Sequence, residues 1–147
     1  MIINFYVQTK ARLPFNRRSV NQIISGSAKI LKVRQNFEIT ILLVGNKKIK
    51  ALNKKFRKIN KVTDVLSFGL QEDKSLVLPP EEKKYLGDIV ICYPQIKKQA
   101  KKFSSSLREE FTLILIHGFL HLLGFEDETK AGNVKMQKSQ AKILAQI

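Results

Sequence analysis

The two histidines of this 147-residue chain, His117 and His121, lie four positions apart in an otherwise apolar segment. In a helix, residues with this spacing lie one turn apart on the same face, so two imidazole nitrogens can bind one metal ion. Residues 111–123, FTLILIHGFLHLL, are apolar on nearly every side, which predicts a buried helix. A pair of hydrogen-bonded core histidines is the alternative, but two rings on one face favour a metal site.

A third metal ligand is available directly after this helix. Gly124 suits the left-handed turn that ends many helices, and three acidic residues follow it, Glu126, Asp127 and Glu128. The spacing from the histidines to Asp127 matches H-x-x-x-H-x-x-G-x-x-[HD], the arrangement of metzincin-type zinc sites. We therefore predict Asp127 as the third ligand, with Glu126 and Glu128 as alternatives. Three protein ligands leave a coordination position for water, as catalytic sites require.

The residue that follows the first histidine separates this site from a peptidase. Peptidases with this spacing carry a glutamate there, which acts as the general base on water. This chain has Gly118 at that position. The usual route of peptide hydrolysis lacks its proton acceptor, so a metallopeptidase is the least favoured function.

The charge of the chain indicates a polyanionic partner. There are 27 lysines and arginines against 12 aspartates and glutamates, which gives a net charge of +15. Residues 46–61, NKKIKALNKKFRKINK, contain eight basic residues and no acidic one. Such a surface attracts nucleic acid, and we favour this partner over membrane headgroups.

The remaining composition limits the compartment and the chemistry. Cys92 is the single cysteine, so no intramolecular disulfide is expected, and MIINFYVQTKARL lacks the pattern of a secretory signal. No window approaches the roughly 18 consecutive apolar residues of a membrane-spanning helix. Nucleotide-loop, dithiol and serine-hydrolase motifs do not occur. We expect a cytoplasmic protein with no membrane partner.

Hydrophobic periodicity predicts the elements that position these residues. We expect strands at 3–7, 37–44, 62–68 and 87–92. We expect helices at about 17–34, after Gly45, at 95–102, from Ser106 to Leu123 and at 132–144.

Three details of these elements are specific enough to check. Ser106 and Glu109 have the spacing of a capping box, which places a helix start there. On the helix after Gly45, the residues expected to face inward are Ile49, Leu52 and Phe56. The polar, proline-bearing residues 71–85 are expected to form a surface excursion.

Three segments resemble the YbeY family of bacterial metal-dependent endoribonucleases. HGFLHLLGFED is similar to the family signature H-G-x-L-H-L-x-G-[YF]-D-H. LNKKFRKINKVTDVLSF is similar to the block L-N-x-x-[YF]-R-x-x-x-x-x-T-D-V-L-S-F, and LGDIVIC to the strand L-G-D-I-x-I. The matches span residues 52–127 in order, whereas the first fifty residues fit by their predicted elements.

The resemblance implies a fold and an activity. The fold would be α+β and zincin-like, with a small mixed sheet of about four strands packed against helices, and residues 1–147 would form one endoribonuclease domain. The activity would be metal-dependent hydrolysis of single-stranded RNA in ribosomal RNA maturation and ribosome quality control. The partners would be single-stranded RNA, ribosomal RNA and the small ribosomal subunit.

The resemblance also implies roles for single residues. His117 and His121 would be metal ligands, and Arg57 would be the active-site arginine. A guanidinium near the metal can bind a phosphodiester and offset charge that develops on it during cleavage. The neighbouring basic surface would hold the RNA strand, and we assign this role to Lys54, Lys58 and Lys61.

The chain departs from the family at the third ligand, where Asp127 replaces a histidine. An anionic ligand lowers the net charge of the site from about +2 to about +1. Zinc remains the metal that we expect first. The carboxylate also favours manganese or magnesium, because these ions prefer oxygen ligands. A weakened metal site would leave a second function, a non-catalytic module that binds RNA or the ribosome.

Overall fold

The computed structural model describes residues 1–69 and 84–147. Within these residues the strands are β1 (Ile2–Val7), β2 (Phe37–Val44), β3 (Val65–Gly69) and β4 (Lys84–Cys92). The helices are α1 (Arg17–Ile30), α2 (Asn46–Arg57), α3 (Tyr93–Lys102), α4 (Leu107–Leu122) and α5 (Lys130–Leu144). Most of the predicted surface excursion lies outside the described residues, and its last two residues, Lys84 and Tyr85, begin β4.

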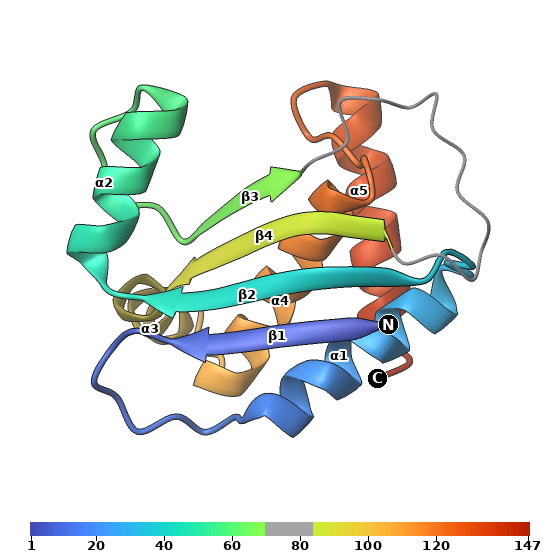
Figure 1. The fold of residues 1–147 in the computed structure, drawn as a ribbon, viewed down its shortest axis with the longest axis horizontal. Coiled ribbons are helices and arrows are strands. Elements are labelled where there is room, and N and C mark those ends of the chain that lie inside the picture. Colours follow the sequence, from blue (N-terminus) through green and yellow to red (C-terminus); the bar gives the residue numbers. More distant parts are fainter. Residues whose placement is uncertain (70–83) are drawn as a thin grey trace.

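The described strands form one mixed sheet in the order β1-β2-β4-β3 (Figure 1). β1 and β4 both pair with β2 in parallel, whereas β3 pairs with β4 antiparallel and forms an edge of the sheet. Parallel neighbours need a crossover connection, and α1 supplies the one between β1 and β2. The predicted α+β fold with a small mixed sheet is confirmed.

The main core lies between the sheet and helices α1 and α4, which cross the rear face in Figure 1. β2 shows how the sequence encodes this face, because alternate residues are almost completely buried, namely Phe37, Ile39, Ile41 and Leu43. Against the opposite face packs α2, around Ile49. Cys92 is buried beneath α2, where burial raises the pKa of its thiol and the thiol donates to Asn46 Oδ1. Its role is therefore packing.

Helix α4 is buried on two sides, as its apolar sequence predicted. Phe111, Leu115 and Phe119 face the main core, while Ile116 and Leu120 contact Met136 and Ile143 of α5. The predicted capping box is present, since Ser106 accepts from Glu109 N and Glu109 accepts from Ser106 N. This packing leaves α4 little freedom to shift. It is a rigid support for the histidines that it carries.

Several predicted boundaries and one predicted packing contact were wrong. α1 ends at Ile30 instead of near residue 34, because Lys32 adopts a left-handed conformation with φ 56°. β3 starts at Val65, since the Asp64 carboxylate accepts from Val65 N and ends the preceding loop. Phe56 was expected to face inward, yet it is 52% exposed.

Among the helices of the described residues, none combines the length and the hydropathy that crossing a membrane needs.

Candidate metal centre

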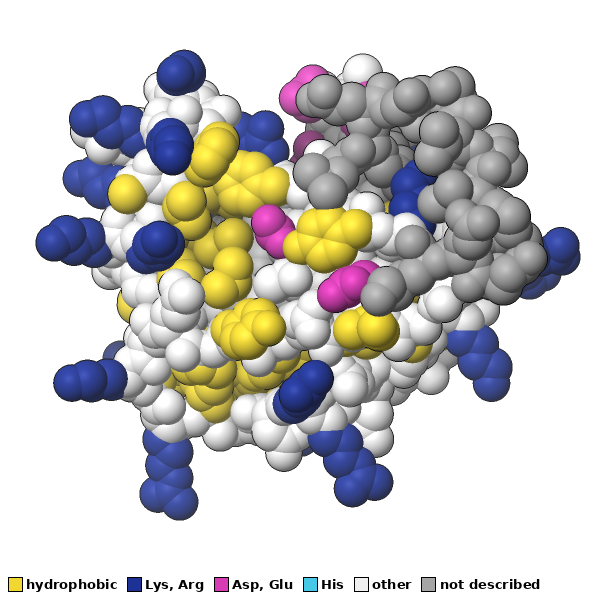
Figure 2. Space-filling model, in the orientation of Figure 1, with side chains coloured by type: hydrophobic (Ala, Val, Ile, Leu, Met, Phe, Trp, Pro, Cys, Tyr) yellow, Lys and Arg dark blue, Asp and Glu magenta, His cyan; other side chains and the backbone are white. Residues whose placement is uncertain are grey.

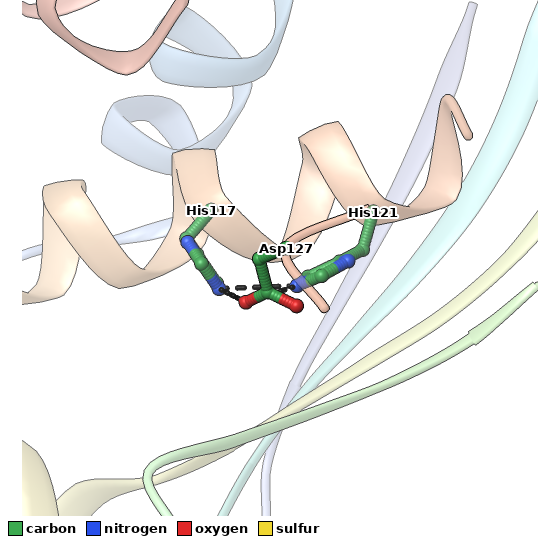
Figure 3. A group of neighbouring side chains, drawn as sticks. All are labelled: His117, His121 and Asp127. Carbon is green, nitrogen blue, oxygen red and sulfur yellow. Dashed lines mark hydrogen bonds and ion pairs between the residues drawn. The ribbon is translucent and has the colours of Figure 1, made fainter. Parts of the chain in front are cut away.

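Three ligand atoms converge at the C-terminal end of α4 (Figure 3). The Nε2 atoms of His117 and His121 lie 3.1 Å apart, and each lies 3.6 Å from Asp127 Oδ2. Both histidines project from α4, and Asp127 comes from the loop that joins α4 to α5. In the described part of the chain, these residues form the one group of three or more His, Cys, Asp or Glu placed to hold a metal ion.

The loop after α4 returns because of its backbone conformation. Gly124 has φ 95°, a value that side chains disfavour, and its N–H donates to His121 O at 3.0 Å. The start of α5 then packs against the loop, since a Cβ on Gly132 would lie 2.5 Å from Glu126 O. Two glycines therefore let the loop turn back and pack closely enough to present Asp127 to the histidines.

Hydrogen bonds on the far side of each ring fix the histidine orientation. Nδ1 of His121 lies 3.0 Å from the backbone oxygen of Phe125, and Nδ1 of His117 lies 2.5 Å from Gln140 Oε1 on α5. A carbonyl oxygen only accepts, so each Nδ1 donates its proton there, and in a neutral ring Nε2 is then the nitrogen with the lone pair. Contacts of this kind are typical of metal-binding histidines.

The donor set fits a divalent cation. Two nitrogen lone pairs and a carboxylate oxygen repel one another at these distances unless a positive charge lies between them. Ligands at about 2.0–2.1 Å from a tetrahedral ion are separated by about 3.3 Å. The observed separations of 3.1 and 3.6 Å bracket that value. The three side chains are 27%, 28% and 40% exposed, so solvent can reach them.

Replacing Gln140 by leucine should weaken metal binding without removing a ligand. The His117 ring would lose the acceptor for its Nδ1 proton and could rotate, and loss of such an outer contact typically costs about 10- to 100-fold in metal affinity. A competition titration with a chromophoric chelator measures the effect. Gln140→Glu, which keeps an acceptor, should retain affinity, and Gln137→Leu on the exposed side of α5 is the control. Unchanged affinity in Gln140→Leu would show that this contact does not position His117.

The triad opens into a cleft of about 530 Å³. Arg57 of α2 lines this cleft together with His117, His121 and Asp127, although α2 and α4 lie far apart in the sequence. Arg57 Nη2 donates to the backbone oxygen of Ser67 at 2.7 Å, which holds the guanidinium at the edge strand β3. The cleft therefore combines three candidate metal ligands with one oriented cation.

The other predicted site residues lie at different distances from this centre. Glu126 and Glu128, the alternative third ligands, line the cleft but are absent from the converging group. Lys54, Lys58 and Lys61 are exposed on α2 and the loop after it, and they do not line the cleft. The geometry thus brings Arg57 to the triad and leaves the three lysines on the surrounding surface.

Packing also explains why position 118 is a glycine. A Cβ at this position would lie 2.8 Å from Ile89 Cγ2 on β4, and Ser67 Oγ donates to Gly118 O at 3.2 Å. A glutamate general base could enter only if α4 moved away from the sheet. The arrangement therefore works against a peptidase of the metzincin type.

Sequence reasoning missed Gln140. Its helix was predicted, but Gln140 lies 23 positions after His117, and no spacing rule connects the two. The signal that could have found it is physical: a metal-binding imidazole needs an acceptor for its second nitrogen, and α5 is the next element after the ligand loop.

Comparison with known proteins agrees with this geometry. The family described as Endoribonuclease YbeY matches residues 4–147. Endoribonuclease YbeY of Moorella thermoacetica is 38% identical over 130 residues, covering 86% of this chain and 83% of the relative. Endoribonuclease YbeY of Limosilactobacillus reuteri is 34% identical over 152 residues, covering 98% and 96% of the two chains.

A solved structure has a similar fold. The solution structure of TM1509 from Thermotoga maritima superposes with a TM-score of 0.61 at 25% sequence identity, covering 98% of this chain and 90% of that one. The range matched by the family, residues 4–147, spans both histidines, Asp127 and Arg57. This chain belongs to the YbeY family of endoribonucleases.

Proposed function

We propose that residues 1–147 act as a single metal-dependent endoribonuclease domain that hydrolyses single-stranded RNA during ribosomal RNA maturation and ribosome quality control. Family membership supports an enzyme that hydrolyses RNA, because the matching relatives are named Endoribonuclease YbeY. The observation that carries the proposal is the convergence of His117, His121 and Asp127 in a cleft that Arg57 shares.

His117, His121 and Asp127 would hold the divalent cation, with Asp127 favoured over Glu126 and Glu128 because its Oδ2 lies nearest both rings. These residues would hold a cation that would supply Lewis acidity toward a phosphoryl oxygen and toward water. Two imidazoles and a carboxylate suit zinc, and the carboxylate also admits manganese or magnesium.

Arg57 would bind and orient the scissile phosphodiester. One of its N–H groups donates to Ser67 O, and the guanidinium carbon lies 5.3 Å from the centroid of the Phe68 ring. A guanidinium has five N–H donors, so most of them remain for phosphate oxygens. Because its position is fixed in advance, Arg57 can offset the negative charge that develops on phosphorus at little cost in reorganisation.

The basic surface around the cleft would bind the rest of the substrate. Lys54, Lys58 and Lys61 flank Arg57 in the sequence block 46–61, which has no acidic residue. Such a surface binds the phosphate backbone without reading its sequence. As the natural target we propose ribosomal RNA of the small ribosomal subunit, in the cytoplasm.

Metal removal and replacement test the proposal. Protein treated with a chelator should not cut an unstructured RNA, and zinc, manganese or magnesium should each be tried for restoration. We expect restored cutting of the single strand and little cutting of a matched duplex, measured by gel analysis of end-labelled RNA. Stoichiometric RNA binding with no metal-dependent cutting would instead favour the non-catalytic RNA- or ribosome-binding module. Cleavage of a peptide with none of RNA would favour a metallopeptidase.

A further inference from the structure

Phe56 is an exposed aromatic ring beside the cleft. It is the second-last residue of α2, and it is 52% exposed although Ile49 on the same helix is fully buried. Among the described strands, β3 forms this edge of the sheet, and Phe56 of α2 contacts Phe68 of β3 there. The Phe68 ring therefore lies on one side of Phe56, and much of the remaining surface of Phe56 faces solvent.

The ring is held in place by its neighbours. Phe56 meets Phe68 edge-on, with ring centroids 5.2 Å apart and an interplanar angle of 62°. Phe68 in turn contacts the guanidinium of Arg57, which is hydrogen-bonded to Ser67 O. Phe56, Phe68 and Arg57 thus form a connected unit, which we call the aromatic platform. Little conformational freedom would be lost when a ligand binds to it.

A buried asparagine fixes the loop that follows the platform. Asn53 is 5% exposed, and its side-chain amide donates to Lys61 O at 3.0 Å. Its backbone oxygen accepts from the N–H groups of Lys58 and Ile59. These bonds hold the loop against α2. Lys58 and Lys61 are therefore held on an ordered loop directly after α2 and not on a free segment.

The surroundings of the platform are strongly positive. Lys55 Nζ lies over the Phe56 ring, 5.2 Å from its centroid, so a base that stacks on that face would displace this exposed lysine. Figure 2 shows hydrophobic side chains exposed over α2 with lysines and arginines around them. A hydrophobic protein partner would not require this charge, whereas a nucleic acid offers both a flat apolar base and an anionic backbone. Charge complementarity therefore points to RNA.

We propose that the aromatic platform stacks an unpaired nucleobase of the RNA, one that lies beside the phosphate held at Arg57. This inference rests on the proposed function. It explains how the enzyme would select single-stranded RNA over a duplex. Bases within a duplex are already stacked and cannot reach the exposed face of Phe56, whereas those of a single strand can. Phe56 is then a positioning residue for the substrate.

The chain contains no tryptophan, so Phe56→Trp creates a single fluorescent reporter at the platform. With a chelator present to keep RNA intact, an unstructured oligoribonucleotide should quench this tryptophan, and a matched duplex should not. Phe103 is the control position, because it is 61% exposed and has Lys102 Nζ 5.6 Å from its ring but does not line the cleft. Phe103→Trp should show no quenching by either RNA.

Affinity provides the second measurement. Phe56→Ala should raise the Kd for the single strand by roughly 5- to 100-fold, the range for loss of one base–aromatic stack, and should leave duplex binding unchanged. Phe56→Trp should restore affinity, and Phe103→Ala should match the wild type. Thermal melting shows whether Phe56→Ala is folded, and the tryptophan reporter tests the proposal even if it is not.

Three outcomes would overturn the inference: absence of quenching in Phe56→Trp, unchanged single-strand affinity in Phe56→Ala, or equal loss for both RNAs. The first would point to a protein that covers the platform. None of them affects metal-dependent cutting by the wild-type enzyme, measured in parallel. Conversely, quenching without any cutting would keep the platform and refute the nuclease.

Discussion

Replacing His117 by alanine will remove the bound divalent metal and reduce RNA cleavage by more than about 100-fold. The triad then retains one imidazole and one carboxylate, too few to hold zinc against competing water. This loss exceeds the 10- to 100-fold typical of an outer contact, because the substitution deletes a ligand atom itself. Metal content by elemental analysis and cleavage of an unstructured RNA are the two measurements.

Variants of the three carboxylates in the ligand loop test which one is the third ligand, and the two glutamates serve as controls. Asp127→Asn should lose metal as His117→Ala does, whereas Glu126→Gln and Glu128→Gln should keep it, because these two line the cleft outside the converging group. The His117 side chain is partly exposed, so the folded state should persist, which thermal melting checks. Full metal content in His117→Ala would refute the site, and metal loss in Glu126→Gln or Glu128→Gln would move the third ligand.

The part of the site that was predictable from sequence depends on local rules. The spacing of His117 and His121 fixes their common face once a helix is assigned, and the helix follows from its apolar length and its capping box. Gly124 marks the turn that brings Asp127 back. Each step involves residues close in the sequence. That proximity is why the geometry of the triad could be anticipated before any coordinates.

The part that was not predictable depends on contacts between distant segments. Gln140 reaches His117 only because α5 packs on α4, and no local sequence pattern predicts that packing. Phe56 has the helical spacing of a core residue, but β3 is an edge strand of the sheet that the described residues form, and Phe56 remains half exposed there. Hydrophobic periodicity identifies which face of a helix is apolar; it does not identify where the sheet ends.

Replacing Arg57 by alanine should lower kcat by about 100- to 1,000-fold while metal content stays unchanged. This is the range for loss of one preorganised donor directed at developing charge. Arg57 belongs to α2 and contacts Ser67 and Phe68, and no hydrogen bond joins it to the triad among the described residues. The triad should therefore still bind its cation. Single-turnover cleavage at saturating RNA, with elemental analysis of the same sample, separates these effects.

Two further variants decide how Arg57 acts. Arg57→Lys keeps the charge but loses the planar fork and its fixed donor geometry, so we expect a rate between wild type and Arg57→Ala. Lys47→Ala, an exposed cation at the opposite end of α2, should leave kcat unchanged. If Arg57→Lys restored the full rate, charge alone would suffice and the fixed geometry would be irrelevant. If Arg57→Ala lost metal in proportion to activity, Arg57 would support the site's structure, and binding of the scissile phosphate would have to come from another cation.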